Sequence, residues 1–399
     1  MELDLIQIPK NNLDYSNILI SKSNESLSTN SSEWKSLPKN MGNNLHQICS
    51  YMAMFPPSVP NYFIKKYSKP GDFVLDIFSG RGTTVLEACM ENRIGIGNDM
   101  SPLAFLLTKT KCNVPMKSTV IRRIIQLQRK FVSDENKIDI SNEEPDIRMI
   151  FHDYTLKQLV FLKKELKWKT SNVDAFVTSL IEGIIHGGSK GYLSLSMPNT
   201  FSMAPNYIKN YIAQHSLKKP KRETFELLLR KLERCYQRPT QKGIAYRHDA
   251  KRMKRIRDSS IDLIITSPPY LRVIKYGKFN WIRVWFLGEN CAEVDQSLFF
   301  SQSLDKYCIF MTEVMKETKR VLKDKGKAVF VIGDVKDRFT HNVENLAEQV
   351  WERCARPLGF KLVEPIIEDV ISDDLKVSKI WGKKRGKATK IDRILVLKN

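Results

Sequence analysis

Residues 71–99, which read GDFVLDIFSGRGTTVLEACMENRIGIGND, decide the fold. The short apolar run FVLDIF (73–78) is typical of a buried strand, and SGRGTT (79–84) forms a turn that contains two glycines. VLEACMEN (85–92) favours a helix, and RIGIGND (93–99) returns to strand. Strand, glycine loop, helix and strand in this order predict a βαβ half-unit.

Continuous apolar runs recur later in the chain, at residues 261–265, 328–332 and 391–397. Each is flanked by apolar residues at helical spacing. Strands that are apolar on both faces are typical of a sheet covered by helices on both sides. The sequence therefore predicts an α/β fold with a doubly wound, mostly parallel sheet.

A stretch with few strand-like runs divides the two strand-rich parts. TLKQLVFLKKELKWK (155–169) and RETFELLLRKLERCYQR (222–238) both show apolar residues at helical spacing. The Ser/Asn-rich residues 21–36 have no apolar period and indicate a flexible linker, so ordered structure is expected from about Met41. We therefore expect an N-terminal arm (1–40), a first part of the α/β domain (41–111), a mostly helical insertion (112–240) and a second part (241–399).

Length and composition exclude several classes of protein. The 399 residues are 42% hydrophobic, enough for a sizeable core, so the chain is neither disordered nor a small disulfide scaffold. The N-terminus lacks a signal peptide's apolar stretch, and no run approaches the roughly 20 apolar residues that span a bilayer, so a cytoplasmic protein is expected. The seven cysteines and six histidines are scattered without metal-ligand spacing, which predicts free, buried thiols and no metal site.

The charge is the unusual feature of the composition. Lys and Arg number 65 against 44 Asp and Glu, a net charge of +21, and such an excess favours a polyanionic partner. Residues 209–257 hold 16 basic and 4 acidic side chains, a net +12, and KKRGKATKIDR (383–393) is a second basic stretch. A solvated helix face is the ordinary explanation of one basic stretch, but two in a chain this basic favour phosphate binding and a nucleic-acid partner.

The first motif with chemical content is DIFSGRGTT, Asp76 to Thr84. In doubly wound sheets ligands bind beyond the carboxyl ends of strands, where glycines let the backbone approach them closely. A dinucleotide fingerprint requires a third glycine where Val85 stands, which argues against NAD. Asp99, after the second strand, is placed to accept two ribose hydroxyls or to cap the helix near Pro102, and Asp249 either holds an adenine amino group or closes a turn.

The second motif is TSPPY, Thr266 to Tyr270, after the apolar strand DLIIT. Two successive prolines fix φ and remove two N–H donors, which leaves a stiff loop with its carbonyls directed into the crevice. A proline loop that merely ends a buried strand is the alternative. The glycine motif at the end of another strand favours the functional interpretation.

Together these motifs resemble the S-adenosylmethionine-dependent DNA methyltransferases that act on exocyclic amino groups. DIFSGRGTT is similar to the family's cofactor motif, and TSPPY to its catalytic motif (D/N/S)-P-P-(Y/F), in the serine form associated with N4-cytosine enzymes. GIGNDMSPLA, RHDA, RVLKDKGKAVFVIGD and, less specifically, HQICSYMAMFPPSVPNYFI extend the resemblance over about residues 45–111 and 245–399. The resemblance implies a Rossmann-like methyltransferase fold.

The resemblance also implies roles for single residues. Cofactor contacts are expected from Phe78, Gly80, Gly82 and Thr83, with Asp76 at the methionine end, Asp99 at the ribose and Asp249 at the adenine. In the catalytic set Ser267, Pro268, Pro269 and Tyr270, the Ser267 side chain and the Pro268 carbonyl would accept the cytosine N4 hydrogens, while Tyr270 stacks on the base. The implied activity is methyl transfer to cytosine N4 in duplex DNA after base flipping, in a restriction-modification system with a separate cognate endonuclease.

Several alternatives stay open at this point. The same fold is compatible with an enzyme that methylates adenine N6, with an enzyme that methylates RNA, and with a catalytically silent nucleic-acid-binding protein. The absence of a Cys directly after a Pro argues against methylation at cytosine C5. The insertion is the expected target-recognition region, with residues 194–207 as either a DNA-reaching or a packing loop. GIIHGGSKG (183–191) lacks the Gly-Lys-Ser/Thr of a phosphate loop and predicts a turn, and Trp281 and Trp285 are expected in a helix core.

Overall fold

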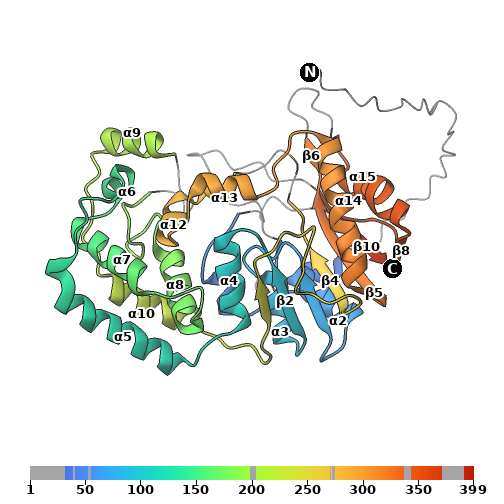
Figure 1. Cartoon of the computed structure of the whole chain (residues 1–399), viewed down its shortest axis with the longest axis horizontal. Helices are drawn as coiled ribbons and strands as arrows, with labels where there is room; N and C mark the ends of the chain where they lie inside the picture. Colours follow the sequence, from blue (N-terminus) through green and yellow to red (C-terminus); the bar gives the residue numbers. More distant parts are fainter. Residues whose placement is uncertain are drawn as a thin grey trace, which may run out of the picture.

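The computed structural model describes residues 32–38, 41–52, 55–197, 204–269, 271, 275–336, 343–370 and 391–399. Its centre is a sheet with the order β3-β2-β1-β4-β5-β10-β8, in which β9 also pairs with β10 (Figure 1). The pairs among the first five strands of that order are parallel, and β10 runs antiparallel to β5, β8 and β9. The strands are β1 (Phe73–Asp76), β2 (Ile94–Asn98), β3 (Ile244–Tyr246), β4 (Ile261–Thr266), β5 (Leu322–Gly333), β8 (Lys361–Leu362), β9 (Ile367–Val370) and β10 (Ile391–Lys398). The predicted doubly wound, mostly parallel sheet is confirmed.

Helices cover both faces of this sheet because its strands are apolar on both sides. Leu75, Ile264 and Phe330 pack into a core with α14 (Leu304–Val321) and α15 (Leu346–Val350). Their sequence neighbours Val74, Leu263 and Val329 face the opposite core, with α2 (Ser58–Tyr67) and α3 (Thr83–Met90). The period-two alternation of strand side chains thus serves two cores at once.

A helical layer lies beside the sheet (Figure 1). Its helices share one core with α4 (Pro102–Cys112), which also contacts β2 and β3. Trp281 and Trp285 of α12 (Trp281–Phe286) are buried in that core, as expected from their spacing. The layer consists of α5 (Lys117–Asp134), α6 (Pro145–Ile150), α7 (Asp153–Glu165), α8 (Asn172–Ile184), α9 (Pro205–His215) and α10 (Thr224–Cys235).

The remaining described elements are short. They are η1 (Asn44–Gln47), η2 (Glu135–Lys137), α11 (Tyr276–Phe279), α13 (Cys291–Ser297), the two-stranded pair β6 (Val335–Lys336) and β7 (Val343–Glu344), a π-helical segment (Trp351–Ala355) and a 3₁₀ turn (Arg356–Leu358). Within the described ranges, none of the helices has the length and apolar character needed to cross a membrane.

Residues 32–38, which the sequence assigned to the N-terminal arm, are described by the structure and contain a short helix. Helix α1 (Ser32–Lys35) lies inside the expected arm and linker, and its Trp34 is only 3% exposed. The Trp34 ring packs on Tyr62 and Phe63, and its Nε1 donates to Asp369 Oδ2 at 3.0 Å. One large aromatic side chain fixes this segment, a contribution that the polar composition around it conceals.

Two smaller expectations also need correction. Cys291 is only partly buried, whereas the other six cysteines are buried free thiols as expected. Gly183 and Ile184 belong to helix α8, so the predicted turn of GIIHGGSKG begins only after them. In residues 194–207, Leu195 and Met197 are buried in the described part, while residues 198–203 lie outside the described residues.

Gly183 offers a sharp test of how the helical layer packs on the cofactor-motif half. A Cβ at this position would lie 1.8 Å from the backbone carbonyl oxygen of Ile48, much closer than any real contact. Alanine favours a helix interior by about 1 kcal/mol over glycine, but overpacking against backbone costs about 3 kcal/mol or more. We expect Gly183→Ala to lower the free energy of unfolding by at least about 2 kcal/mol in urea titrations. Gly191→Ala is the control, since its nearest neighbour would be 3.7 Å away, and equal effects of both would contradict this packing.

Candidate active site

A cavity of about 380 Å³ opens at the carboxyl ends of β1, β2, β3 and β4. Most of the residues predicted from the two motifs meet there, although about 180 residues of sequence separate the motifs. The predicted residues on its wall are Phe78, Gly80, Asp99, Asp249, Ser267, Pro268 and Pro269. Tyr270 lies outside the described residues.

The glycine loop has a conformation that requires its glycines. Gly80 and Gly82 both have positive φ, 48° and 73°, and Gly82 is the residue before the first turn of α3. A Cβ on Gly82 would also lie 3.0 Å from the Thr108 backbone. The loop is tied to the next strand, because the Gly80 N–H donates to Asp99 Oδ2 at 2.9 Å.

Asp99 is held in place by the backbone and still faces the cavity. Its Oδ1 accepts from the Ser101 N–H at 2.9 Å, and its Oδ2 is the acceptor for Gly80. A carboxylate has about four acceptor positions, so two remain for a ligand. The alternative of a helix cap is wrong, because Ser101 caps α4 through its Oγ. Burial raises the Asp99 pKa to about 6, against the lowering effect of the two backbone hydrogen bonds.

Asp76, Gly82 and Thr83 lie behind the cavity wall rather than on it. Asp76 is 2% exposed and accepts a hydrogen bond from Thr266 Oγ1 at 2.7 Å and one from the Phe78 N–H at 3.2 Å. Asp76 therefore joins the end of β1 to the end of β4, where the second motif begins. Desolvation raises the Asp76 pKa to about 7. The Thr83 hydroxyl accepts from Arg81 Nε at 3.1 Å.

Asp249 closes a turn and lies on the cavity wall, whereas its contact with an adenine amino group stays a prediction. Its Oδ1 accepts from the Lys251 N–H at 2.9 Å, which closes a turn, and the exposed side chain also lines the cavity. The turn is held by buried Asn98, whose side chain both donates to the His248 carbonyl and accepts from the His248 N–H, each at 3.0 Å. The end of β3 is thereby fixed to the end of β2.

Sequence reasoning missed an aromatic part of the cavity wall. Tyr51 and Tyr276 stack with centroids 5.9 Å apart, and the Tyr51 ring lies 3.4 Å from where a Gly80 Cβ would be. Buried Arg283 fixes both segments, donating to Ser50 O and to Asn280 Oδ1 at 3.1 Å each. Tyr51 falls in the segment HQICSYMAMFPPSVPNYFI, which was the only available signal for this wall.

A second cavity of about 500 Å³ adjoins the first. The two share Gln296, Leu298, Phe299 and Phe300. Phe299 stacks on Phe310 with centroids 4.0 Å apart, and Phe300 is 43% exposed. Lys275, Lys278 and Asp295 complete the polar wall, with the Asp295 carboxylate accepting from the backbone N–H groups of Gly277 and Lys278. In the part of the chain that the structure describes, no cluster of His, Cys, Asp and Glu could hold a metal ion.

Comparison with known sequences finds a resemblance over the first quarter of the chain. Residues 2–109 match the model of the N6/N4 DNA methylase family. The type II methyltransferase M.MjaII of Methanocaldococcus jannaschii is 40% identical over 68 residues, 17% of this chain and 13% of that protein. M.PvuII of Proteus hauseri is 42% identical over 55 residues, 14% of this chain and 16% of that protein. The chain therefore matches only about one seventh of the length of these relatives, and the matches support a resemblance to DNA amino-methyltransferases.

Solved structures give weaker likenesses. The TTHA0409 protein of Thermus thermophilus, solved in complex with S-adenosyl-L-methionine, is 23% identical and covers 38% of this chain and 53% of its own, with a TM-score of 0.24. A SAM-dependent methyltransferase of Methanosarcina mazei is 11% identical and covers 84% of this chain and 96% of its own, with a TM-score of 0.35.

Proposed function

We propose that this protein is a DNA methyltransferase that transfers a methyl group from S-adenosylmethionine to an exocyclic amino group, the N4 amine of cytosine. The observation that carries the proposal is the shared cavity. The glycine loop with Asp99 forms one part of its wall, and Ser267, Pro268 and Pro269 form another. A group-transfer enzyme requires donor and acceptor sites in this kind of contact.

The residues present fit the proposed cofactor. Asp99 has two acceptor positions left for ribose hydroxyls, and Gly80 presents backbone without a side chain. Asp249 stands at the end of β3, where an adenine amino group would find an acceptor. The volume of about 380 Å³ lies in the range of small-molecule sites. The cofactor supplies an electrophilic methyl group on a sulfonium.

The second motif provides hydrogen-bond acceptors that can make an aromatic amine a better nucleophile. The nitrogen lone pair is delocalised into the ring, so acceptors that draw on the amino hydrogens favour a tetrahedral nitrogen with a free lone pair. Ser267 Oγ and the Pro268 carbonyl are these acceptors. Asp76 does not contact the ligand in this proposal. It positions the catalytic loop, because its hydrogen bond holds Thr266, the residue before Ser267.

The second cavity gives room for the target base. A base must leave the duplex before it can react, which costs a few kcal/mol, and an aromatic stacking partner offsets part of that cost. Phe300, exposed between the two cavities, and Tyr270 of the catalytic motif are the stacking partners that we propose.

One experiment tests the reaction and the choice of acceptor. The protein is incubated with methyl-labelled S-adenosylmethionine and mixed-sequence duplex DNA, the DNA is digested, and the modified nucleoside is identified by mass spectrometry. We expect N4-methylcytosine. N6-methyladenine would overturn the cytosine assignment, label found only in RNA would overturn the DNA assignment, and absence of label in any nucleic acid would favour a silent binding protein.

The proposed function also includes a partner and a biological role. Duplex DNA is the proposed partner, since the net charge of +21 suits a polyanion. A role in restriction-modification, with a separately encoded endonuclease, rests on the resemblance to type II methyltransferases. Co-purification of a nuclease that cleaves only unmethylated DNA of the same site would support that setting.

A further inference from the structure

The segment Lys251–Arg257, KRMKRIR, forms a strip that we call the basic rim. Its five cationic side chains, Lys251, Arg252, Lys254, Arg255 and Arg257, are all exposed. The two apolar residues between them point the other way, with Met253 0% and Ile256 4% exposed in the core beneath α14. The alternation directs every charge of the segment to solvent.

The backbone of the basic rim is held rigidly. The Met253 N–H donates to Glu317 Oε1 at 2.5 Å. Arg320 donates to the Met253 carbonyl at 3.2 Å and to the Ile256 carbonyl at 2.9 Å. Because α14 supplies both partners, the rim presents its cations from a fixed scaffold, which lowers the entropy cost of binding.

The charges of the basic rim are not neutralised by neighbouring acids. Across the described residues, Arg252, Lys254, Arg255 and Arg257 have no carboxylate within ion-pair distance, and Lys251 has only Asp249 at 3.4 Å. Asp258, the next residue in the chain, and Glu317, which accepts from the Met253 N–H, both pair with Arg320. Clustered like charges repel one another, so this arrangement is unfavourable unless an anion binds.

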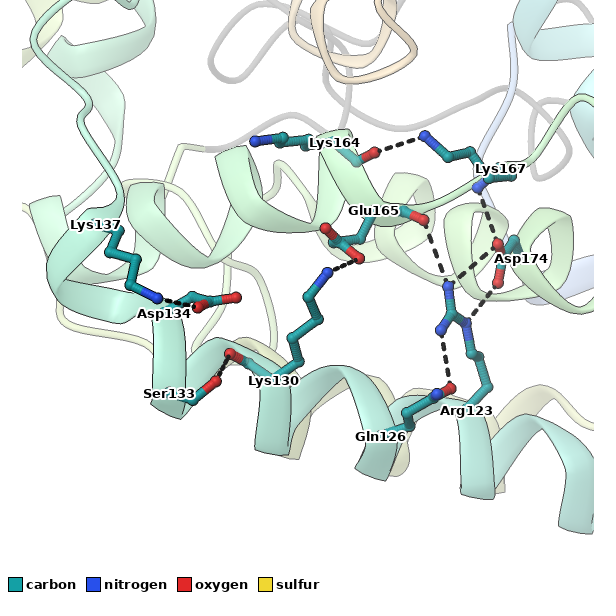
Figure 2. A network of polar contacts seen from close by, with 10 residues as sticks. All are labelled: Arg123, Gln126, Lys130, Ser133, Asp134, Lys137, Lys164, Glu165, Lys167 and Asp174. Carbon is teal, nitrogen blue, oxygen red and sulfur yellow. Dashed lines mark hydrogen bonds and ion pairs between the residues drawn. The ribbon is translucent and has the colours of Figure 1, made fainter.

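Helix α5 shows the opposite arrangement (Figure 2). Arg123 pairs with Asp174 at 2.8 Å and Lys130 with Glu165 at 2.6 Å, both across to neighbouring segments. Lys137, just after the helix, pairs with Asp134 at 3.1 Å. Arg123 and Lys130 of α5 thus have internal carboxylate partners and serve the fold, whereas among the described residues four of the five cations of the basic rim have none.

The basic rim begins at the mouth of the cavity. Lys251 lines the cavity next to Asp249. His248 lines it too, and Arg255 and Lys254 are close enough to add to burial in lowering the His248 pKa. An extended polyanion bound on the rim would therefore lie next to this cavity.

We propose that the basic rim binds the phosphate backbone of duplex DNA and holds it over the cavity mouth. The identity of the polyanion rests on the proposed function, whereas the presence of an anion-binding strip rests on the geometry alone. Each phosphate contact releases counterions, so its loss is visible as a smaller dependence of binding on salt.

The test replaces four cations that do not line the cavity, Arg252, Lys254, Arg255 and Arg257, by Gln. Binding of a fluorescein-labelled, mixed-sequence duplex of about 20 base pairs is followed by anisotropy between 50 and 200 mM salt. If all four side chains contact phosphates, the slope of log K against log salt falls in magnitude by about 3.6, and by about 1.8 if only two do. The matched control removes the same charge from the α5 region, with Arg122, Arg129, Lys130 and Lys137 changed to Gln.

In the control variant, the slope of log K against log salt is expected to differ from that of the unmodified protein by less than roughly 0.9, the value of one phosphate contact. Equal reductions in both variants would mean that only net charge matters, and no reduction in the rim variant would mean that other residues hold the backbone. Either result overturns the inference, as does an effect confined to duplex RNA. Methyl transfer is measured separately. Rim-dependent DNA binding without transfer would refute the proposed function alone, and transfer without rim-dependent binding would refute the inference alone.

Discussion

Replacing Ser267 by Ala is expected to lower turnover by about 10²- to 10³-fold, the usual effect of removing one group that stabilises a transition state. The affinity for S-adenosylmethionine should change less than about twofold. The reason is a division of the cavity wall, in which Ser267 follows β4 while Gly80 and Asp99 follow β1 and β2. In the proposed mechanism the hydroxyl acts on the acceptor nitrogen and makes no contact with the cofactor.

Single-turnover methylation of duplex DNA measures the first quantity and calorimetric titration of the cofactor the second. Ser260→Ala is the matched control, because Ser260 lies just before β4 at the opposite end and its Oγ donates only to the Arg257 carbonyl at 2.6 Å. That variant should retain turnover within about threefold, in line with a single exposed hydrogen bond. Parallel loss of turnover and cofactor affinity in Ser267→Ala would show that the loop is structural.

The parts of the fold that the sequence predicts are those whose signal is local. The run FVLDIF lies in and just after β1, and the later runs lie in β4, β5 and β10, because strands buried on both faces must be apolar throughout. The short edge strands β8 and β9 gave no such signal. In β9 only alternate residues, Ile367 and Asp369, are buried, and its pairing with β10 depends on the rest of the sheet.

The same distinction applies to the candidate site. Asp99, Asp249 and Ser267 could be predicted on the cavity wall because parallel strands bring their carboxyl ends to one edge of the sheet. The motif gives no orientation for each side chain, so Asp76 and Thr83, which lie behind the wall, could not be told apart from Gly80. Tyr51, Tyr276 and Phe299 come from segments whose approach to the cavity depends on tertiary packing, such as the hydrogen bonds of Arg283.

Asp99 should make cofactor binding dependent on pH. In the ionised form both oxygens can accept ribose hydroxyls, and protonation converts one of them into a donor. Since the Asp99 pKa is raised to about 6, affinity for S-adenosylmethionine should be nearly constant above pH 7 and weaken about tenfold by pH 5. Asp99→Asn should bind roughly 100-fold more weakly at pH 8, from the loss of two charge-assisted hydrogen bonds of about 1.5 kcal/mol each.

Two other buried acids titrate nearby and need a control. Desolvation raises the pKa values of Asp76 and Glu87 to about 7. Glu87 lies behind the glycine loop, where it contacts His46 Nε2 at 2.6 Å and accepts from Asn61 Nδ2 at 2.9 Å, and it does not line the cavity. Glu87→Gln mimics the protonated carboxyl with nearly the same shape, so this variant should keep the pH dependence that Asp99→Asn loses.

Unfolding does not account for the expected weakening at low pH, because the stability linkage of these acids has the opposite sign. Asp76, Glu87 and Asp99 all have pKa values raised above their ordinary values of 3.8 to 4.5, so the folded state binds protons more tightly than the unfolded chain. Their contribution to stability is fully present below about pH 4 and is lost as pH rises through 6 to 7. As the pH falls from 7 to 5, protonation of these groups therefore raises the free energy of unfolding, and the thermal midpoint should not fall because of them.

Calorimetric titration of S-adenosylmethionine at pH 5, 6, 7 and 8 measures the affinity. A pH dependence that persists in Asp99→Asn would place the titrating group elsewhere and refute the role of Asp99 as the ribose acceptor.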